Sequence, residues 1–435
     1  MEIMSLENAL NQLQVVECSF MKWKTFSIKD RVQVVEDIKK TLLENKEKYA
    51  KAITSDMNKP IKQSMAEVEK CAYLCDYYIE HAEQFLEKQY VKTRWSESFI
   101  EFQPLGVLLG VMPWNFPFWQ VFRFVIPSLL VGNTFVVKHA SNVPESARCL
   151  EEVFNSKTID FPIYLNLNVK SDVIKDVIAH PIVKAVSLTG SENAGRSVAT
   201  EAGKHLKKCV LELGGSNAFI VLEDADLETT LDIAINARMQ NAGQSCIAGK
   251  RFLIHESLYD DFISGLMKRV QALKTGDKWD TSTEFGAMAR EDLAEELEGQ
   301  VNKSIEMGAT LVCGGKREGA FFEPTILSDV TMKMPVGNEE TFGPVAAIIK
   351  IKDFDEAIEI SNQSEFGLGV SIFSKDVERV ESKISMFDEG AVFINEMVIS
   401  DPYLPFGGIK KSGYGRELSQ YAMHEFANIR SVVIK

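Results

Sequence analysis

Cys246 lies in a run of small and polar residues, Asn241-Ala242-Gly243-Gln244-Ser245-Cys246-Ile247, which lacks the bulk of an apolar core. A thiolate nucleophile needs access, a backbone that the substrate can approach closely, and a nearby base or positive field. Gly243 and Ser245 suit the first two needs, and the run contains no base. Taken alone, it also fits a packed, unreactive cysteine, the commoner fate of this residue type.

Two residues elsewhere could supply the polar groups that thiol chemistry requires. Glu212 lies between leucines and beside two glycines, where desolvation raises a carboxyl pKa toward the range of a general base. Asn115 lies between Pro113 and Pro117, in a fixed loop whose side-chain amide could stabilise an oxyanion. The alternatives are a buried, paired structural glutamate and an asparagine that makes local turn hydrogen bonds.

A third set of residues could bind phosphate. Thr189-Gly190-Ser191 follows an apolar strand and opens a helix, and a helix N-terminus with a hydroxyl can hold an anion. The spacing fits neither Gly-x-Gly-x-x-Gly nor a Walker A loop, so Ser191 could equally be a plain helix cap. Lys138, at the end of an earlier strand, could reach a ribose or a phosphate, or could be a solvated lysine.

The elements that must position these residues follow an α/β pattern. Amphipathic spacing predicts helices at 28–42 and 65–86, and an extended, polar-alternating segment at 90–102. Short apolar runs then alternate with helical patterns, which is typical of parallel strands with crossover helices. We expect strands at 107–112, 134–138, 183–188, 218–222, 252–255, 345–349, 370–373 and 392–395.

Composition limits the class of protein. A chain of 435 residues with 45% hydrophobic content predicts two or more domains, and a net charge of −14 argues against nucleic acid or an anionic membrane as partner. The absence of a long apolar run or a basic leader predicts a soluble, cytoplasmic protein. Seven cysteines predict free thiols, and six scattered histidines predict no metal site.

Together the motifs resemble those of the aldehyde dehydrogenases, in the family's order and approximate spacing across nearly the whole chain. They are Pro113-Trp114-Asn115, Leu188-Thr189-Gly190-Ser191, Glu212-Leu213-Gly214-Gly215, Gly243-Gln244-Ser245-Cys246, Glu339-Glu340-Thr341-Phe342-Gly343-Pro344-Val345 and Pro405-Phe406-Gly407-Gly408-Ile409-Lys410. The resemblance implies two doubly wound α/β domains plus a β oligomerisation arm, and a homodimer or homotetramer. The dinucleotide-binding domain would span 1–89 and 104–213, the catalytic domain 214–415, and the arm 90–103 and 416–435.

The resemblance also implies roles. Cys246 would attack the aldehyde carbon, the Asn115 amide and the Cys246 N–H would hold the alkoxide, and water activated by Glu212 would hydrolyse the thioester. The residues implied in binding NADP or NAD are Trp114, Lys138, Ser141, Gly190, Ser191, Glu340 and Phe342. At position 141 some NAD-using relatives carry a glutamate that binds the ribose 2′-hydroxyl. Ser141 leaves room for a 2′-phosphate and removes a repelling charge, so NADP should be accepted.

The substrate prediction depends on Arg123, an arginine in an otherwise apolar helix, which is costly to bury unless it is paired. Its partner could be an incoming carboxylate or an intramolecular acid. The runs 139–143 and 394–402 look most like bacterial succinate-semialdehyde dehydrogenases, in which an arginine at this place holds the distal carboxylate, with Ser400 as a second contact. Gln240 stands where some relatives have another arginine, which weakens this prediction.

Other hypotheses stay open at this point. The enzyme could act on another small aliphatic aldehyde, or the fold could be an inactive nucleotide-binding protein. A cysteine hydrolase is disfavoured because no histidine lies near Cys246 or Glu212 in the sequence. The stretch 155–164 also lacks the glycine-rich turn common in the family, so the adenine side of the cofactor pocket could differ.

Overall fold

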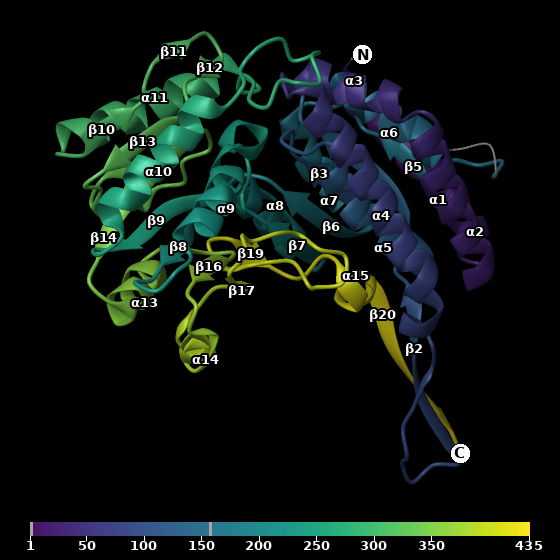
Figure 1. The fold of residues 1–435 in the computed structure, drawn as a ribbon. Helices are drawn as coiled ribbons and strands as arrows, with labels where there is room; N and C mark the ends of the chain where they lie inside the picture. Colours follow the sequence, from purple (N-terminus) through teal and green to yellow (C-terminus); the bar gives the residue numbers. More distant parts are fainter. Residues whose placement is uncertain (1–2, 156–158) are drawn as a thin grey trace.

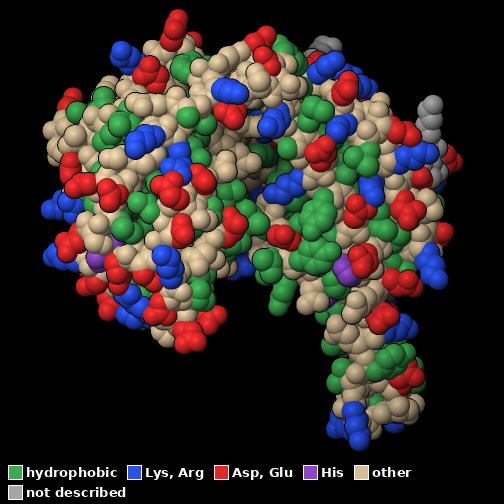
Figure 2. All heavy atoms as spheres, in the orientation of Figure 1, with side chains coloured by type: hydrophobic (Ala, Val, Ile, Leu, Met, Phe, Trp, Pro, Cys, Tyr) green, Lys and Arg blue, Asp and Glu red, His purple; other side chains and the backbone are tan. Residues whose placement is uncertain are grey.

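Two lobes and a projecting arm make up the molecule, as the computed structural model shows for residues 3–155 and 159–435 (Figure 1). Acidic and basic side chains are interspersed over the face shown in Figure 2, which is hollowed between the lobes. In the described part of the chain, no helix combines the length and the apolar character needed to cross a membrane. The α/β fold class expected from the motifs is confirmed by the sheets and helices described below.

The first lobe contains a six-stranded sheet in the order β19-β7-β6-β3-β4-β5. Every neighbouring pair is parallel except β19 and β7, so crossover helices connect the strands. The strands are β3 (Val107–Met112), β4 (Thr134–His139), β5 (Tyr164–Asn166), β6 (Val183–Thr189), β7 (Lys208–Glu212) and β19 (Gly413–Tyr414). The helices between them are α5 (Trp119–Val131), α6 (Pro144–Phe154), α7 (Ile174–Ala179) and α8 (Glu192–Lys204).

Four N-terminal helices complete the first lobe: α1 (Leu6–Trp23), α2 (Ile28–Glu44), α3 (Lys46–Met57) and α4 (Ile61–Phe85). The apolar stripes at 28–42 and 65–86 predicted α2 and α4, and Ser27 opens α2 with a capping box. Helix α1 was not predicted. The Trp23 indole at its end donates to the Leu129 carbonyl of α5 at 3.1 Å, which fastens the helix to the lobe's core.

The second lobe contains a seven-stranded sheet in the order β10-β13-β14-β9-β8-β16-β17, parallel except for the β10–β13 pair. The strands are β8 (Asn217–Val221), β9 (Gly249–His255), β10 (Thr310–Cys313), β13 (Thr325–Ser328), β14 (Val345–Ile351), β16 (Val370–Phe373) and β17 (Val392–Ile394). Its main helices are α9 (Leu227–Met239), α10 (Tyr259–Ala272), α11 (Glu291–Glu306) and α13 (Phe354–Asn362). Strands predicted from apolar runs are confirmed in both lobes.

A three-stranded antiparallel sheet forms the arm, from β1 (Gln89–Tyr90), β2 (Glu97–Pro104) and β20 (Ala427–Ile434) (Figure 1). Strands β2 and β20 pair from Glu97↔Ile434 to Pro104↔Ala427. The short helix α15 (Ser419–Glu425) precedes β20 in the chain. Ile429 and Val433 on the outer strand β20 are more than half exposed. Assembly through this arm stays a prediction.

The stretch 155–164, expected to be altered, is described only in part. The Asn155 side chain accepts from the Ile163 and Tyr164 amides at 3.0 and 3.2 Å and donates to the Tyr164 carbonyl at 2.6 Å. These bonds hold the entry to β5 against the end of α6. Residues 156–158, which belong to the same stretch, lie outside the described residues.

Asn133 ties three parts of the first lobe together. Its fully buried side chain accepts from the Leu105 and Gly106 amides at 2.8 and 3.1 Å. It also donates to the Ser128 and Phe426 carbonyls at 3.1 and 3.0 Å. The amide of Asn133 therefore binds the start of β3, the end of α5 and the C-terminal segment at once.

We predict that Asn133→Ala lowers the free energy of unfolding by about 3 kcal/mol, because four buried main-chain groups lose their partner. Chemical denaturation measures the change. Asn11→Ala, at an exposed position of α1, is the control and should change stability by less than about 0.5 kcal/mol. Equal midpoints for the two variants would contradict this role for Asn133.

Candidate functional site

Cys246 borders two cavities that meet at its side chain. The first has a volume of about 420 Å³ and is lined by residues of both lobes, among them Trp114, Gly190, Ser191, Glu340 and Phe342. The second has about 190 Å³ and is lined by Arg123, Gln240, Ser400 and Phe406 among others. A reactive group at this position can meet a molecule entering from either side.

The backbone before Cys246 turns through three consecutive left-handed residues, Asn241, Ala242 and Gly243, with φ of 54°, 51° and 72°. Left-handed φ is costly for alanine, so the surroundings must hold this turn in place. A Cβ at Gly243 would lie 2.3 Å from the Gly343 carbonyl oxygen, so only glycine fits there. The Asn241 side chain donates to the Asn115 carbonyl at 2.8 Å.

The structure brings Asn115 against the loop that carries Cys246, and the roles that the motifs imply for these two residues stay predictions. The Oδ1 of Asn115 accepts from Gln120 at 2.9 Å, which orients the amide, and its Nδ2 donates to the Gln244 carbonyl at 3.1 Å. An amide nitrogen carries two hydrogens, so one donor of Asn115 has no partner in these hydrogen bonds. Asn115 lines the first cavity.

A buried ion pair that the sequence did not reveal supports the Asn115 loop. Lys59 and Glu67 lie 2.6 Å apart with 1% and 2% of their side chains exposed. Glu67 accepts from the Phe118 and Trp119 amides at 3.0 and 3.1 Å, and Lys59 donates to the Asn115 carbonyl at 3.3 Å. The pair therefore holds the loop at Asn115 and just after Pro117.

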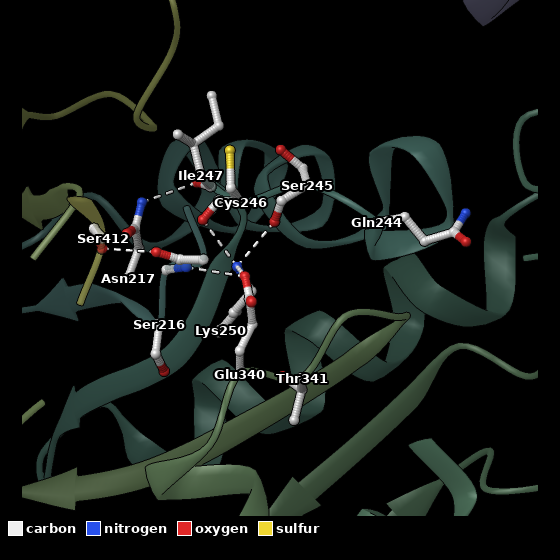
Figure 3. Close-up of polar contacts among 12 residues, drawn as sticks. Ser216, Asn217, Gln244, Ser245, Cys246, Ile247, Lys250, Glu340, Thr341 and Ser412 are labelled. Carbon is white, nitrogen blue, oxygen red and sulfur yellow. Dashed lines mark hydrogen bonds and ion pairs between the residues drawn. The ribbon is translucent and has the colours of Figure 1, made fainter. Parts of the chain in front are cut away.

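Lys250 joins the nucleophile's loop to the first cavity (Figure 3). This fully buried ammonium donates to the Ser245 and Cys246 carbonyls at 2.9 Å each and lies 3.3 Å from Glu340 Oε1. The same Glu340 oxygen accepts from the Gly215 amide at 2.9 Å. Sequence reasoning missed Lys250, although a lysine inside an apolar strand four residues after a candidate nucleophile is a signal that could have identified it.

The electrostatic field at Cys246 has opposing parts. Burial raises the pKa of the thiol, while the positive charges of Arg123 and Lys250 lower it and the Glu340 and Glu212 carboxylates raise it. The two cations therefore supply the positive field that the loop itself lacks. Removing one of them should shift the thiol further toward its protonated form.

Glu212 ends β7 and is buried, and neither of its carboxyl oxygens has a hydrogen-bond partner among the described residues. Burial raises its pKa well above the ordinary value; the neighbouring Glu417 raises it further, and Arg123 and Arg416 lower it. A Cβ built on Gly407 would lie 2.8 Å from Glu212 Oε1, so the carboxyl needs the space beside that glycine. Glu212 lines neither of the two cavities.

Arg123 is paired within the chain, which is the alternative that the sequence left open. Its guanidinium forms an ion pair with Glu417, with side chains only 2% and 3% exposed, and lies 4.5 Å over the Phe406 ring. Arg123 still lines the second cavity, as does Ser400. Glu417 was not predicted, because it lies far along the chain in a segment without a periodic pattern.

The residues expected to bind the cofactor divide into two groups. Trp114, Gly190, Ser191, Glu340 and Phe342 line the first cavity. Within this group, the Trp114 and Phe342 rings meet edge to face at 5.6 Å, and the Ser191 hydroxyl caps α8 by accepting from Ala194 at 3.4 Å.

The second group, Lys138 and Ser141, lies outside the lining of this cavity, as far as the chain is described. Lys138 is half-buried at the end of β4, and burial lowers its pKa. Ser141 is exposed in the turn that follows.

Arg238 is a further supporting residue that sequence reasoning missed. It is fully buried on α9, and its guanidinium donates to the Val345 and Thr341 carbonyls at 2.6 and 3.0 Å and to the Gly343 carbonyl. These bonds hold the loop that carries Glu340 and Phe342 against the helix that leads into Cys246.

Comparison with known proteins agrees with this geometry. Residues 6–432 match the model of the aldehyde dehydrogenase family. The succinate-semialdehyde dehydrogenase [NADP(+)] of Deinococcus radiodurans is 44% identical over 95% of this chain and 87% of its own length. The succinate semialdehyde dehydrogenase [NAD(P)+] Sad of Escherichia coli is 44% identical over 97% and 92%.

A solved structure is also similar. The succinic semialdehyde dehydrogenase from Streptococcus pyogenes, in complex with NADP+ as the cofactor, superposes with a TM-score of 0.97 at 37% identity. The match covers 100% of this chain and 96% of that chain. The arrangement of lobes and arm is therefore shared with that protein.

We predict that Lys250→Gln shifts the pH dependence of Cys246 alkylation by iodoacetamide to higher pH, because glutamine can still donate but carries no charge. At neutral pH the alkylation should be several-fold slower, as measured by mass spectrometry of the Cys246 peptide. Cys209, partly exposed in the same molecule, is the internal control and should react at an unchanged rate. An unchanged Cys246 profile would show that the Lys250 charge does not act on the thiol.

Proposed function

Because the chain belongs to the aldehyde dehydrogenase family, we propose that it oxidises succinate semialdehyde to succinate with NADP or NAD. The observation that carries the proposal is the position of Cys246 at the meeting point of two cavities. One is lined by five of the seven residues expected at the cofactor, and the other by Arg123 and Ser400. The names of the relatives, at 44% identity over most of both chains, support this substrate and both cofactors.

The first cavity fits a dinucleotide. A Cβ at Gly214 would lie 2.3 Å from Glu340 Oε2, so glycine leaves the carboxylate free to face the cavity, where it can accept from ribose hydroxyls. Trp114 and Phe342 provide an aromatic wall, and Gly190 and Ser191 provide the N-terminus of α8 for phosphate. We propose that these residues, with Lys138 and Ser141, hold the cofactor, whose nicotinamide accepts a hydride when bound.

The chain's own residues perform the covalent chemistry in this proposal. The Cys246 thiolate adds to the aldehyde carbon, and the carbonyl electron pair moves onto the oxygen, which the Asn115 amide and the Cys246 N–H stabilise. After oxidation the carbon is held as a thioester. Water then attacks this carbon, Glu212 accepts the water's proton, and the carbon–sulfur bond breaks to release the acid and the thiolate.

We propose further that the protein works in the cytoplasm as a homodimer or homotetramer. All seven cysteines are free, as expected in a reducing compartment. The outer strand β20 of the arm carries exposed Ile429, Val433 and Ile434, which can pair with another subunit as an edge strand.

We predict that Glu212→Gln lets the acyl-enzyme form but slows its hydrolysis by about 100-fold or more, because an amide cannot accept the water's proton. Rapid mixing should then show one burst of reduced cofactor followed by a slow steady state, whereas Cys246→Ser should show no burst. Because burial raises the pKa of Glu212, hydrolysis in the native protein should accelerate as pH rises above the range of a free glutamate. A native steady-state rate in Glu212→Gln would reject this assignment.

We also predict that Ser141→Glu lowers kcat/KM for NADP by about tenfold or more and retains activity with NAD, because a carboxylate there repels a 2′-phosphate. Ser141→Gln, of similar length and neutral, is the matched control and should lose less. Steady-state kinetics with each cofactor gives the ratio. Equal losses with both cofactors would place Ser141 away from the ribose.

A further inference from the structure

Lys70 lies on α4 and lines the second cavity, which Cys246 also lines. Its ammonium donates to Ser400 Oγ at 2.9 Å and lies 4.3 Å over the Trp119 ring. The sequence pattern did not single out this lysine, because α4 carries many charged residues on its exposed side. The fold places it opposite the nucleophile's loop.

The charged side chains that line this cavity differ in whether they have a partner of opposite charge. Arg123 is paired with Glu417, and Glu67 is paired with Lys59 and accepts from two main-chain amides. Among the described residues, Lys70 forms no ion pair. Lys70 is therefore the cation in this cavity that can still bind an anion.

The surroundings of Lys70 destabilise its charged form when no anion is bound. Burial lowers its pKa to about 8, and the positive charge of Arg123 lowers it further, against the smaller raising effects of Cys71, Glu67 and Asp401. A carboxylate that enters the cavity would counteract the effects of burial and of Arg123 on the pKa of Lys70. The ammonium is thus held beside a hydroxyl, in a partly desolvated place where a charged hydrogen bond is strong.

We propose that Lys70, together with Ser400, binds the carboxylate at the far end of the aldehyde substrate and so determines specificity. Arg123 lies deeper, where its charge is shared by Glu417 and Glu212. This inference rests on the proposed function, because it requires a substrate that carries an aldehyde at one end and a carboxylate at the other. Cys246 and Lys70 line the same cavity, so one short molecule can reach both.

The test compares succinate semialdehyde with butanal, an uncharged aldehyde of the same carbon number. Lys70→Met should raise KM for succinate semialdehyde by about 30-fold, the effect of losing one charged hydrogen bond, and should leave KM for butanal within about twofold. Lys70→Arg should restore part of the affinity. Lys62→Met, on the exposed side of the same helix, is the matched control and should change neither value.

Three further measurements separate binding from chemistry and folding. Succinate, the product, should bind the Lys70→Met variant about 30-fold more weakly than the native protein by calorimetry, and thermal unfolding should show that the variant is folded. In the native protein, KM for succinate semialdehyde should rise as pH increases above about 8, where Lys70 loses its proton. The butanal profile, which shares Cys246 and Glu212, should lack that rise, and Lys70→Arg should remove it.

The outcomes distinguish the two proposals. If the native protein prefers succinate semialdehyde and Lys70→Met leaves its KM and succinate binding unchanged, the role of Lys70 is wrong and the proposed function stands. Equal losses on both aldehydes would assign Lys70 a structural role and also overturn the inference. If the native protein does not favour succinate semialdehyde over butanal, both the proposed substrate and the role of Lys70 are rejected.

Discussion

A buried lysine must satisfy its hydrogen bonds within the protein, and Lys250 does so with groups from separate segments of the chain. Two partners are consecutive carbonyls at Ser245 and Cys246, and the third is the Glu340 carboxylate, which also accepts from Gly215. Removing the Glu340 carboxylate would leave the buried Lys250 ammonium without its ion-pair partner, which costs several kcal/mol. The loop that carries Cys246, the glycine turn after β7 and the Glu340 side of the first cavity are therefore fixed relative to one another.

The same principle recurs around Cys246. Lys59 with Glu67 holds the Asn115 loop, and Arg123 with Glu417 lies beside Glu212. Buried ion pairs add little net stability, because desolvation offsets much of their attraction. Their value here is geometric, since each pair tolerates only a narrow range of positions. A thiol, an amide and a carboxyl from distant parts of the sequence are thereby held near one another.

Much of this site could be predicted from sequence because its signals are local. Periodic apolar runs indicated the strands, and short motifs indicated Cys246, Asn115 and Glu340, which the structure brings to the walls of one cavity. The ion pairs could not be predicted in this way, since nothing in the sequence near Arg123 indicates Glu417. Lys70 was missed for the same reason, because its neighbours Ser400 and Trp119 are distant in the sequence. Lys250 differs, because its position inside an apolar strand is a signal that the sequence does contain.

The position of β19 has a consequence for how the protein forms during synthesis. Gly413 and Tyr414 pair with Glu212 and Leu211 at the edge of the first sheet, and Phe406, Leu418 and Phe426 belong to the core of the first lobe. That lobe's other elements leave the ribosome long before these residues do. Until residues 406–426 have been made, its sheet edge and part of its apolar core are not covered, and such surfaces promote aggregation. Loss of residues 406–426 would therefore damage the first lobe, although these residues follow the whole second lobe in the chain.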